Sequence, residues 1–254
     1  MKKDSAARPS SIYLERHLSD GDKTFTETAL LQESKYIVIL AEPGGGKTEL
    51  MKSLARKLDT ETINASVLMF GGISDTNIPL LIDAVDEVAT IEQGSIYKLI
   101  SEVKKAKPAL VIMSSRSSEW GQSSTMVFEQ FLGCTPLLVR LNEFDRQQQS
   151  EIFKSHTSGE DFQNFETEIS RFNLEMLLPN PQFLKMFADA YIESDKHFSD
   201  KRSIFSLAVE RLAKEANAKL PLKPLHLSLE KKNRTRFRSI RKAITIGGRR
   251  NNYN

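Results

Sequence analysis

Three consecutive glycines, followed by a lysine and a threonine, stand between a short apolar run and a stretch that favours a helix. The run, residues 36–40, lacks charged residues, as expected of a strand buried on both faces of a parallel sheet. Residues 47–58 contain no glycine or proline and therefore favour a helix. A strand, a glycine-rich turn and a helix in this order predict an α/β domain with a mostly parallel sheet.

The turn matches the phosphate-binding pattern G-x-x-x-x-G-K-[ST], with Ala41 in the first position. Glycines let successive backbone N–H groups point at phosphate oxygens, and the following helix contributes the positive end of its dipole. In this pattern the Lys47 ammonium reaches the β- and γ-phosphates and the Thr48 hydroxyl binds Mg²⁺. No Asn/Thr-Lys-x-Asp motif for reading guanine is present, which favours ATP. The residues expected to bind the nucleotide are Glu42, Pro43, Gly44, Gly45, Gly46, Lys47 and Thr48.

A second apolar run, residues 78–82, ends in Asp83 and is followed by Asp86 and Glu87. An apolar strand that ends in aspartate is typical of a Walker B motif. We expect Asp83 to hold Mg²⁺ through water, because Mg²⁺ keeps several of its waters in proteins. Either Asp86 or Glu87 would orient or deprotonate the attacking water, and the sequence does not distinguish between them.

A third run, residues 109–113, continues into Ser114, Ser115 and Arg116. If this strand lies between the other two, its carboxyl end faces the γ-phosphate, since ligands of open α/β sheets bind at that edge. Arg116 would then stabilise charge in the transition state. The alternative is an arginine in a serine-rich surface loop.

Further apolar runs at residues 67–70 and 137–139 complete the expected fold, a three-layer α/β domain around a mostly parallel five-stranded sheet, followed by an all-helical subdomain. From about residue 143 onward the apolar spacing is helical throughout. We expect a polar lead-in with one short helix around Tyr13 to His17. The predicted boundaries are 1–34 for the lead-in, 35–142 for the α/β domain, 143–220 for the helical subdomain and 221–254 for a tail.

Composition excludes several classes of protein. Hydrophobic residues make up 39% of the chain and charged residues 27%, which is ordinary for a globular protein. The apolar runs are far shorter than the ~20 residues of a membrane span, and no secretory leader is visible. Cys134 is the only cysteine, and the four histidines are scattered, so no metal other than nucleotide-bound Mg²⁺ is expected. We expect a cytoplasmic protein without a membrane partner.

The charge is distributed unevenly. Residues 221–254 contain ten lysines and arginines against one acidic residue, whereas the whole chain has a net charge of only +3. Such a segment is a candidate for binding nucleic acid, through residues 228–250. The alternative is a solvated, disordered tail, because only Phe237 and Tyr253 could stack on bases.

Together, residues 42–48, 80–87 and 114–116 resemble the NACHT branch of the STAND NTPases, in a short or truncated bacterial form. The resemblance implies a helical subdomain after the sheet and a proline that contacts the nucleotide base, for which Pro181 is the candidate. A proline at the first position of a helix explains Pro181 equally well. The resemblance further implies a nucleotide-gated switch that is closed with ADP, oligomerises with ATP and, in bacteria, often defends against phage.

Three functions follow from these patterns. The first is a signalling switch that binds ATP, hydrolyses it slowly and acts by self-assembly or through a signalling partner. The second is an AAA+-like ATPase that acts on nucleic acid through the basic tail. The third is a nucleotide-binding regulatory subunit without turnover.

Overall fold

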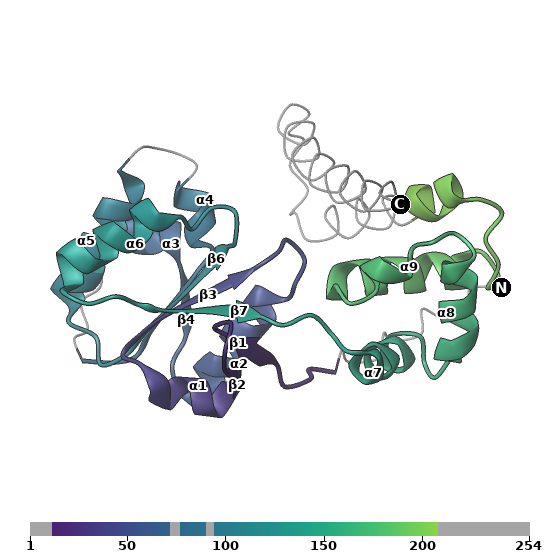
Figure 1. Cartoon of the computed structure of the whole chain (residues 1–254), viewed down its shortest axis with the longest axis horizontal. Helices are drawn as coiled ribbons and strands as arrows, with labels where there is room; N and C mark the ends of the chain where they lie inside the picture. Colours follow the sequence, from purple (N-terminus) through teal and green to yellow (C-terminus); the bar gives the residue numbers. More distant parts are fainter. Residues whose placement is uncertain (1–11, 72–76, 90–93, 208–254) are drawn as a thin grey trace, which may run out of the picture. The chain divides into compact units, whose positions relative to one another are not determined.

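A computed structural model describes residues 12–71, 77–89 and 94–207 of the chain. Its described residues form a seven-stranded sheet with the order β2-β1-β7-β3-β6-β5-β4 (Figure 1). The strands are β1 (His17–Ser19), β2 (Thr24–Thr26), β3 (Tyr36–Ala41), β4 (Thr62–Asn64), β5 (Leu80–Asp83), β6 (Val111–Arg116) and β7 (Leu137–Leu141).

Strands β7, β3, β6, β5 and β4 are parallel neighbours, so their carboxyl ends share one edge of the sheet. In register, Ala41 pairs with Arg116 and Asn64 pairs with Asp83. The third apolar run of the sequence thus lies between the first two, as β6 between β3 and β5. This order brings the ends of the three motifs together.

The prediction of a five-stranded sheet was wrong, because β1 and β2 extend it with antiparallel strands. The predicted helix around Tyr13 to His17 was also wrong, because residues 13–16 have no regular secondary structure and His17 begins β1. Leu18 and Phe25 pair across the hairpin and are both buried, while their strand neighbours are more exposed, which is the alternation of a half-buried strand. Asp20 closes the turn by accepting a hydrogen bond from the Lys23 backbone N–H at 2.9 Å.

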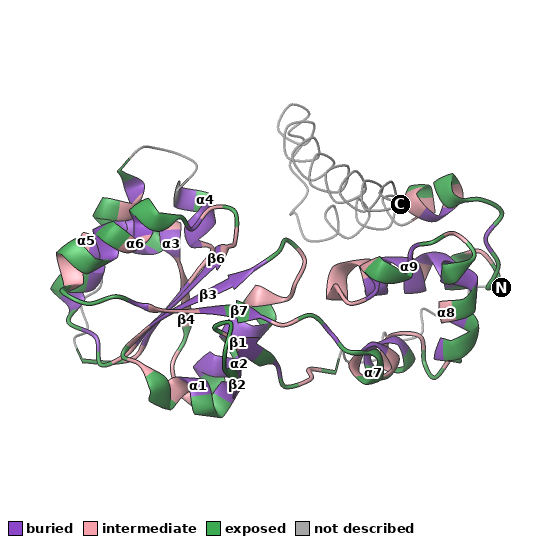
Figure 2. Ribbon diagram, in the orientation of Figure 1, coloured by how far each residue is buried: buried purple, intermediate pink, exposed green. Residues whose placement is uncertain are grey.

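Helices cover both faces of the sheet. Alternate β3 side chains point to opposite faces, so Val38 and Leu40 join one core and Ile37 and Ile39 the other. The first core packs against α3, α4, α5 and α6 and the second against α1 and α2, which gives three layers (Figure 2). The helices are α1 (Glu27–Glu33), α2 (Lys47–Lys57), α3 (Ala65–Gly71), α4 (Val85–Ala89), α5 (Ser95–Ala106) and α6 (Gln122–Leu132).

Residues 67–70 were expected to form a strand but belong to α3. The Asn64 side chain accepts a hydrogen bond from the Ser66 backbone N–H at 2.9 Å and so caps the helix start. Leu68 and Met69 are buried, whereas Phe70 is 75% exposed, which fits a helix with one face on the sheet. Short apolar runs do not distinguish a strand from a buried turn of helix.

Every described element after β7 is helical. Phe153 and Phe165 stack with ring centres 4.4 Å apart, and Tyr191 packs edge-on against Phe165. The elements are α7 (Arg146–His156), α8 (Phe162–Ser170), a 3₁₀ helix (Glu175–Leu177) and α9 (Pro181–Glu193), followed by helical residues 201–207. The predicted tail, residues 221–254, lies outside the described residues.

No helix within the described ranges is long and apolar enough to cross a membrane.

Candidate functional site

The glycine-rich turn connects the carboxyl end of β3 to the start of α2. Gly44 and Gly46 have φ values of +79° and +94°, a backbone region that glycine adopts without strain. The Gly45 backbone N–H donates to the Glu42 carbonyl at 3.0 Å and tightens the turn. Gly46 is the N-cap of α2 and supplies no side-chain acceptor to the helix, so the first N–H groups of α2 suit an anion.

Lys47 is the first residue of α2, directly after the glycines. Its ammonium donates to the Ala41 carbonyl at 3.0 Å and the Glu42 carbonyl at 3.4 Å. Burial lowers the pKa of Lys47 from its ordinary value, an effect that Asp86 opposes and Arg116 reinforces. The loop therefore holds a partly desolvated cation next to the glycines.

Asp83 connects the loop to the neighbouring strands. The Thr48 hydroxyl donates to Oδ2 of Asp83 at 2.9 Å across 35 residues of sequence. The Ser114 hydroxyl and the Ala84 backbone N–H donate to Oδ1, the latter at 3.0 Å. Asp83 is thus fixed in orientation, with the Thr48 hydroxyl beside one of its oxygens.

This donor set fits Mg²⁺. Magnesium in nucleotide sites takes one or two protein oxygens and completes its octahedron with water and phosphate oxygens. Thr48 and Asp83 supply such oxygens next to the phosphate loop. Among the described residues no cluster of three or more His, Cys, Asp or Glu side chains could hold a metal, so a dedicated all-protein cage is absent there.

Asp86 and Glu87 lie in the first turn of α4, directly after β5. Asp86 is buried, and its Oδ2 forms an ion pair with Nε of Arg116 at 2.7 Å. Glu87 is exposed. Arg116 is the last residue of β6 and not part of a surface loop, so the structure brings it to the same edge as the other predicted residues.

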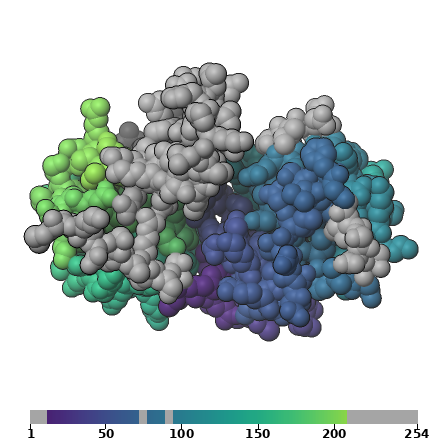
Figure 3. Space-filling view, turned by 180° about the vertical axis from the view of Figure 1, so that it is seen from behind, coloured from purple at the N-terminus to yellow at the C-terminus, as the bar shows by residue number. Residues whose placement is uncertain are grey.

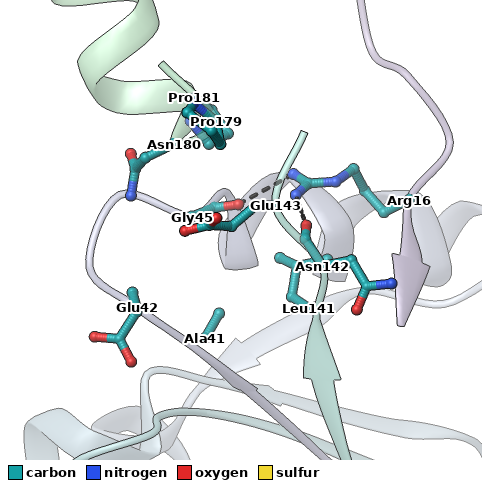
Figure 4. A pocket seen from close by; sticks show the side chains of 10 residues that line it. All are labelled: Arg16, Ala41, Glu42, Gly45, Leu141, Asn142, Glu143, Pro179, Asn180 and Pro181. Carbon is teal, nitrogen blue, oxygen red and sulfur yellow. Dashed lines mark hydrogen bonds between the residues drawn. The ribbon is translucent and has the colours of Figure 1, made fainter. Parts of the chain in front are cut away.

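A pocket opens beside the loop, between the ends of β3 and β7 and the start of α9 (Figure 4). Pro181 is the first residue of α9, and Asn180 caps the helix by accepting from the Gln182 N–H at 3.0 Å. The Asn180 side chain also donates to the Pro43 carbonyl at 3.0 Å. The lining residues are Arg16, Ala41, Glu42, Gly45, Leu141, Asn142, Glu143, Pro179, Asn180 and Pro181.

Sequence reasoning missed three residues of this site. Ser114 was seen only as part of the third run, although a hydroxyl at a strand end next to an aspartate is a usable signal. Asn180 precedes a proline, which signals a helix cap but not a contact with the loop. Arg16 gave no local signal, because its partners lie 29 and 126 residues away.

No protein-family model matches the chain, and no curated protein matches its sequence. Among solved structures, the chain is similar to a RuvB variant from Thermotoga maritima, with 15% identity, a TM-score of 0.43 and coverage of 68% of this chain and 60% of that one. A structure of Hsp104 with ATPγS and casein is similar with 16% identity, a TM-score of 0.43 and coverage of 72% and 40%. The chain thus spans less than two thirds of either neighbour. The functional assignment rests on the residues of this chain.

Proposed function

We propose that this chain binds ATP with Mg²⁺ at residues 42–48 and hydrolyses it. The observation that supports this most strongly is the hydrogen bond between Thr48 and Asp83, which joins the helix after the phosphate loop to the acidic end of β5. A hydroxyl and a carboxylate at this place beside a glycine loop and Lys47 match the chemistry of a nucleoside triphosphate site.

In this proposal the backbone N–H groups of the loop and the Lys47 ammonium bind the phosphates. Thr48 and Asp83 hold Mg²⁺, which neutralises charge on the phosphate oxygens. Ser114 keeps Asp83 oriented through its hydrogen bond to Oδ1. Arg116 lies one strand from the loop, where its guanidinium stabilises charge that develops on the γ-phosphate.

We assign the water-activating role to Glu87. The Oδ2 atom of Asp86 is engaged with Arg116 at 2.7 Å, which makes Asp86 a support for Arg116. Glu87 is exposed on the same helical turn and its carboxylate accepts a proton from the attacking water.

The direct test compares ATP hydrolysis by wild type, Glu87→Gln and Asp86→Asn, with ATP binding measured in parallel. We expect Glu87→Gln to bind ATP normally and to hydrolyse it at least about 100-fold more slowly. Unchanged turnover in Glu87→Gln would contradict the role assigned to Glu87, and ATP binding by the wild type without measurable hydrolysis would favour a regulatory subunit that does not hydrolyse ATP.

For the biological role of this ATP hydrolysis, we propose a NACHT-like STAND switch with slow turnover that acts in bacterial antiphage defence. The contact between Asn180 and the Pro43 carbonyl supports it, because it joins the start of α9 to the phosphate loop. In this proposal Pro181, the first residue of α9, contacts the base. Measuring molecular mass in solution with ADP and with a non-hydrolysable ATP analogue tests the switch, since assembly should occur only with the analogue. Equal mass in both would contradict it.

A second candidate function rests on charge. The ten basic residues within 221–254 favour an AAA+-like ATPase that binds nucleic acid through residues 228–250. If that segment neutralises phosphates, the logarithm of the affinity falls with that of salt concentration, with a slope of about −0.9 per phosphate. Absence of DNA and RNA binding at low salt would exclude this function.

A further inference from the structure

Arg16, just before β1, joins two segments that are distant in sequence. Its Nη1 donates to the Gly45 carbonyl at 3.0 Å and its Nη2 donates to the Asn142 carbonyl at 2.6 Å (Figure 4). Only 4% of the residue is exposed. One planar guanidinium therefore holds the phosphate loop and the end of β7 at a fixed spacing.

The arginine is itself held firmly. Its guanidinium carbon lies 4.2 Å from the centre of the Phe144 ring, and its backbone N–H donates to Glu27 at 2.9 Å. Glu27 is fully buried and accepts a further hydrogen bond from Ser53 of α2 at 2.7 Å. In Figure 3 the purple N-terminal segment lies beside the blue segment that contains α2. The position of Arg16 is thus set by α1 and α2.

Asn142 and Phe144 mark the place where the chain leaves the sheet for the helices. The Phe144 backbone N–H donates to the Pro179 carbonyl at 3.0 Å, directly before the start of α9. A carbon atom added at Gly46 would lie 3.0 Å from Nη1 of Arg16 and 3.8 Å from Pro181. Gly46 of the loop, Arg16 and Pro181 at the start of α9 therefore lie close together.

We infer that Arg16 is a positioning residue that couples the phosphate loop to the helices after β7. Its hydrogen bond to Gly45 fixes a carbonyl of the phosphate loop, and its hydrogen bond to Asn142, with the Phe144 contact, fixes the start of the helical segment. Nucleotide binding, which orders the loop, then also orders the helices. This inference rests on the proposed nucleotide site.

Lysine cannot replace this residue. An ammonium on a flexible stem makes separate point contacts, whereas the guanidinium fork holds two acceptors in one plane. Glutamine removes the charge and leaves at least one of the two partly buried carbonyls without its donor.

The test measures two quantities in the full chain: ATP affinity, and the distance between spin labels on Cys134 and on an Ile192→Cys substitution. Cys134 is the only native cysteine and is exposed, and Ile192 of α9 is 42% exposed. The variants are Arg16→Gln and Arg16→Lys, with Arg140→Gln as the control, an exposed arginine on β7. Lys47→Ala controls for the nucleotide site.

In wild type and Arg140→Gln we expect ATP to narrow the distance distribution. In both Arg16 variants we expect affinity about 10-fold weaker and a distribution that stays broad at saturating ATP. Arg16→Lys keeps the buried charge and serves as the readout if Arg16→Gln does not fold. Unchanged affinity, or a distribution that still narrows at saturation, would overturn the coupling. If wild type does not bind ATP, the proposed function fails instead.

Discussion

Individual side chains at the carboxyl edge of the sheet carry the proposed chemistry, and Lys47 is central among them. Its ammonium donates to two backbone carbonyls of the loop at the distances given above, and Lys47 belongs to neither apolar core of the sheet, so its removal should leave both cores intact. We expect Lys47→Ala to fold normally and to bind ATP at least about 10-fold more weakly, because charge-assisted hydrogen bonds to phosphate are lost. Calorimetric titration with ATP checks this. Unchanged affinity would remove Lys47 from the site.

The effect of replacing Asp83 on ATP binding should depend on Mg²⁺. We expect Asp83→Ala to weaken ATP binding strongly in the presence of Mg²⁺ and only slightly in its absence, because in the proposed site Thr48 and Asp83, which are hydrogen-bonded to each other, act on the phosphates through the ion. Titrations with and without Mg²⁺ measure the difference. Equal weakening under both conditions would contradict the metal role.

Gly44 allows a comparison with a glycine of nearly the same conformation. Gly44 and Gly133 have φ values of +79° and +77°, so alanine at either position should cost about 1–2 kcal/mol of stability. A carbon atom added at Gly44 would lie 2.7 Å from Cβ of Gln182, whereas nothing lies within 4 Å at Gly133. We expect Gly44→Ala alone to weaken ATP binding as well, measured by titration. Weakening by Gly133→Ala to the same extent would show a general effect of destabilisation.

At the scale of elements, the start of α9 combines two roles in Asn180. Its side chain caps the helix and also contacts the Pro43 carbonyl of the loop. We expect Asn180→Ala to lower the free energy of unfolding by about 1 kcal/mol and to weaken ATP binding. The control is Asp161→Ala, which removes the cap of α8, where Asp161 accepts from Gln163 at 2.7 Å. Equal ATP affinity in both variants would show that the Pro43 contact has no influence on the site.

Elements with a long apolar run or a special turn could be predicted from the sequence, and short amphipathic ones could not. Strands β5 and β6 are apolar before their polar ends, β3 contains no charged residue, and the glycines after β3 require a turn. The hairpin β1–β2 buries only one residue in each strand, so its pattern is too short to recognise. Residues 65–71 form a helix because of the Asn64 cap, a signal that the apolar run concealed.

For the molecule as a whole, the site depends on contacts between segments that no local pattern reveals. The parallel direction of β3, β5 and β6 could be expected from the motifs, since the residues of the three motifs meet only if the carboxyl ends of these strands share one edge of the sheet. The contacts of Arg16 with Gly45 and Asn142 could not, because they arise only when the hairpin, the loop and the end of β7 are packed together. Such contacts depend on tertiary structure and not on spacing along the chain.

Binding of ATP should therefore stabilise the whole fold. At a ligand concentration 100 times the dissociation constant, the native state gains about 2.7 kcal/mol. We expect thermal unfolding of the wild type to shift upward with ATP and Mg²⁺, and unfolding of Lys47→Ala to shift clearly less at the same concentrations, because the variant binds ATP more weakly. A shift of equal size in both proteins would point to a nucleotide bound elsewhere.

The most direct test is an experimental structure with a non-hydrolysable ATP analogue and Mg²⁺. We expect β- and γ-phosphates within hydrogen-bond distance of the backbone N–H groups of residues 44–48, with the ion next to Thr48 and Asp83. A nucleotide bound away from this loop, or an ion coordinated without either residue, would show that residues 42–48 and Asp83 do not form the nucleotide site.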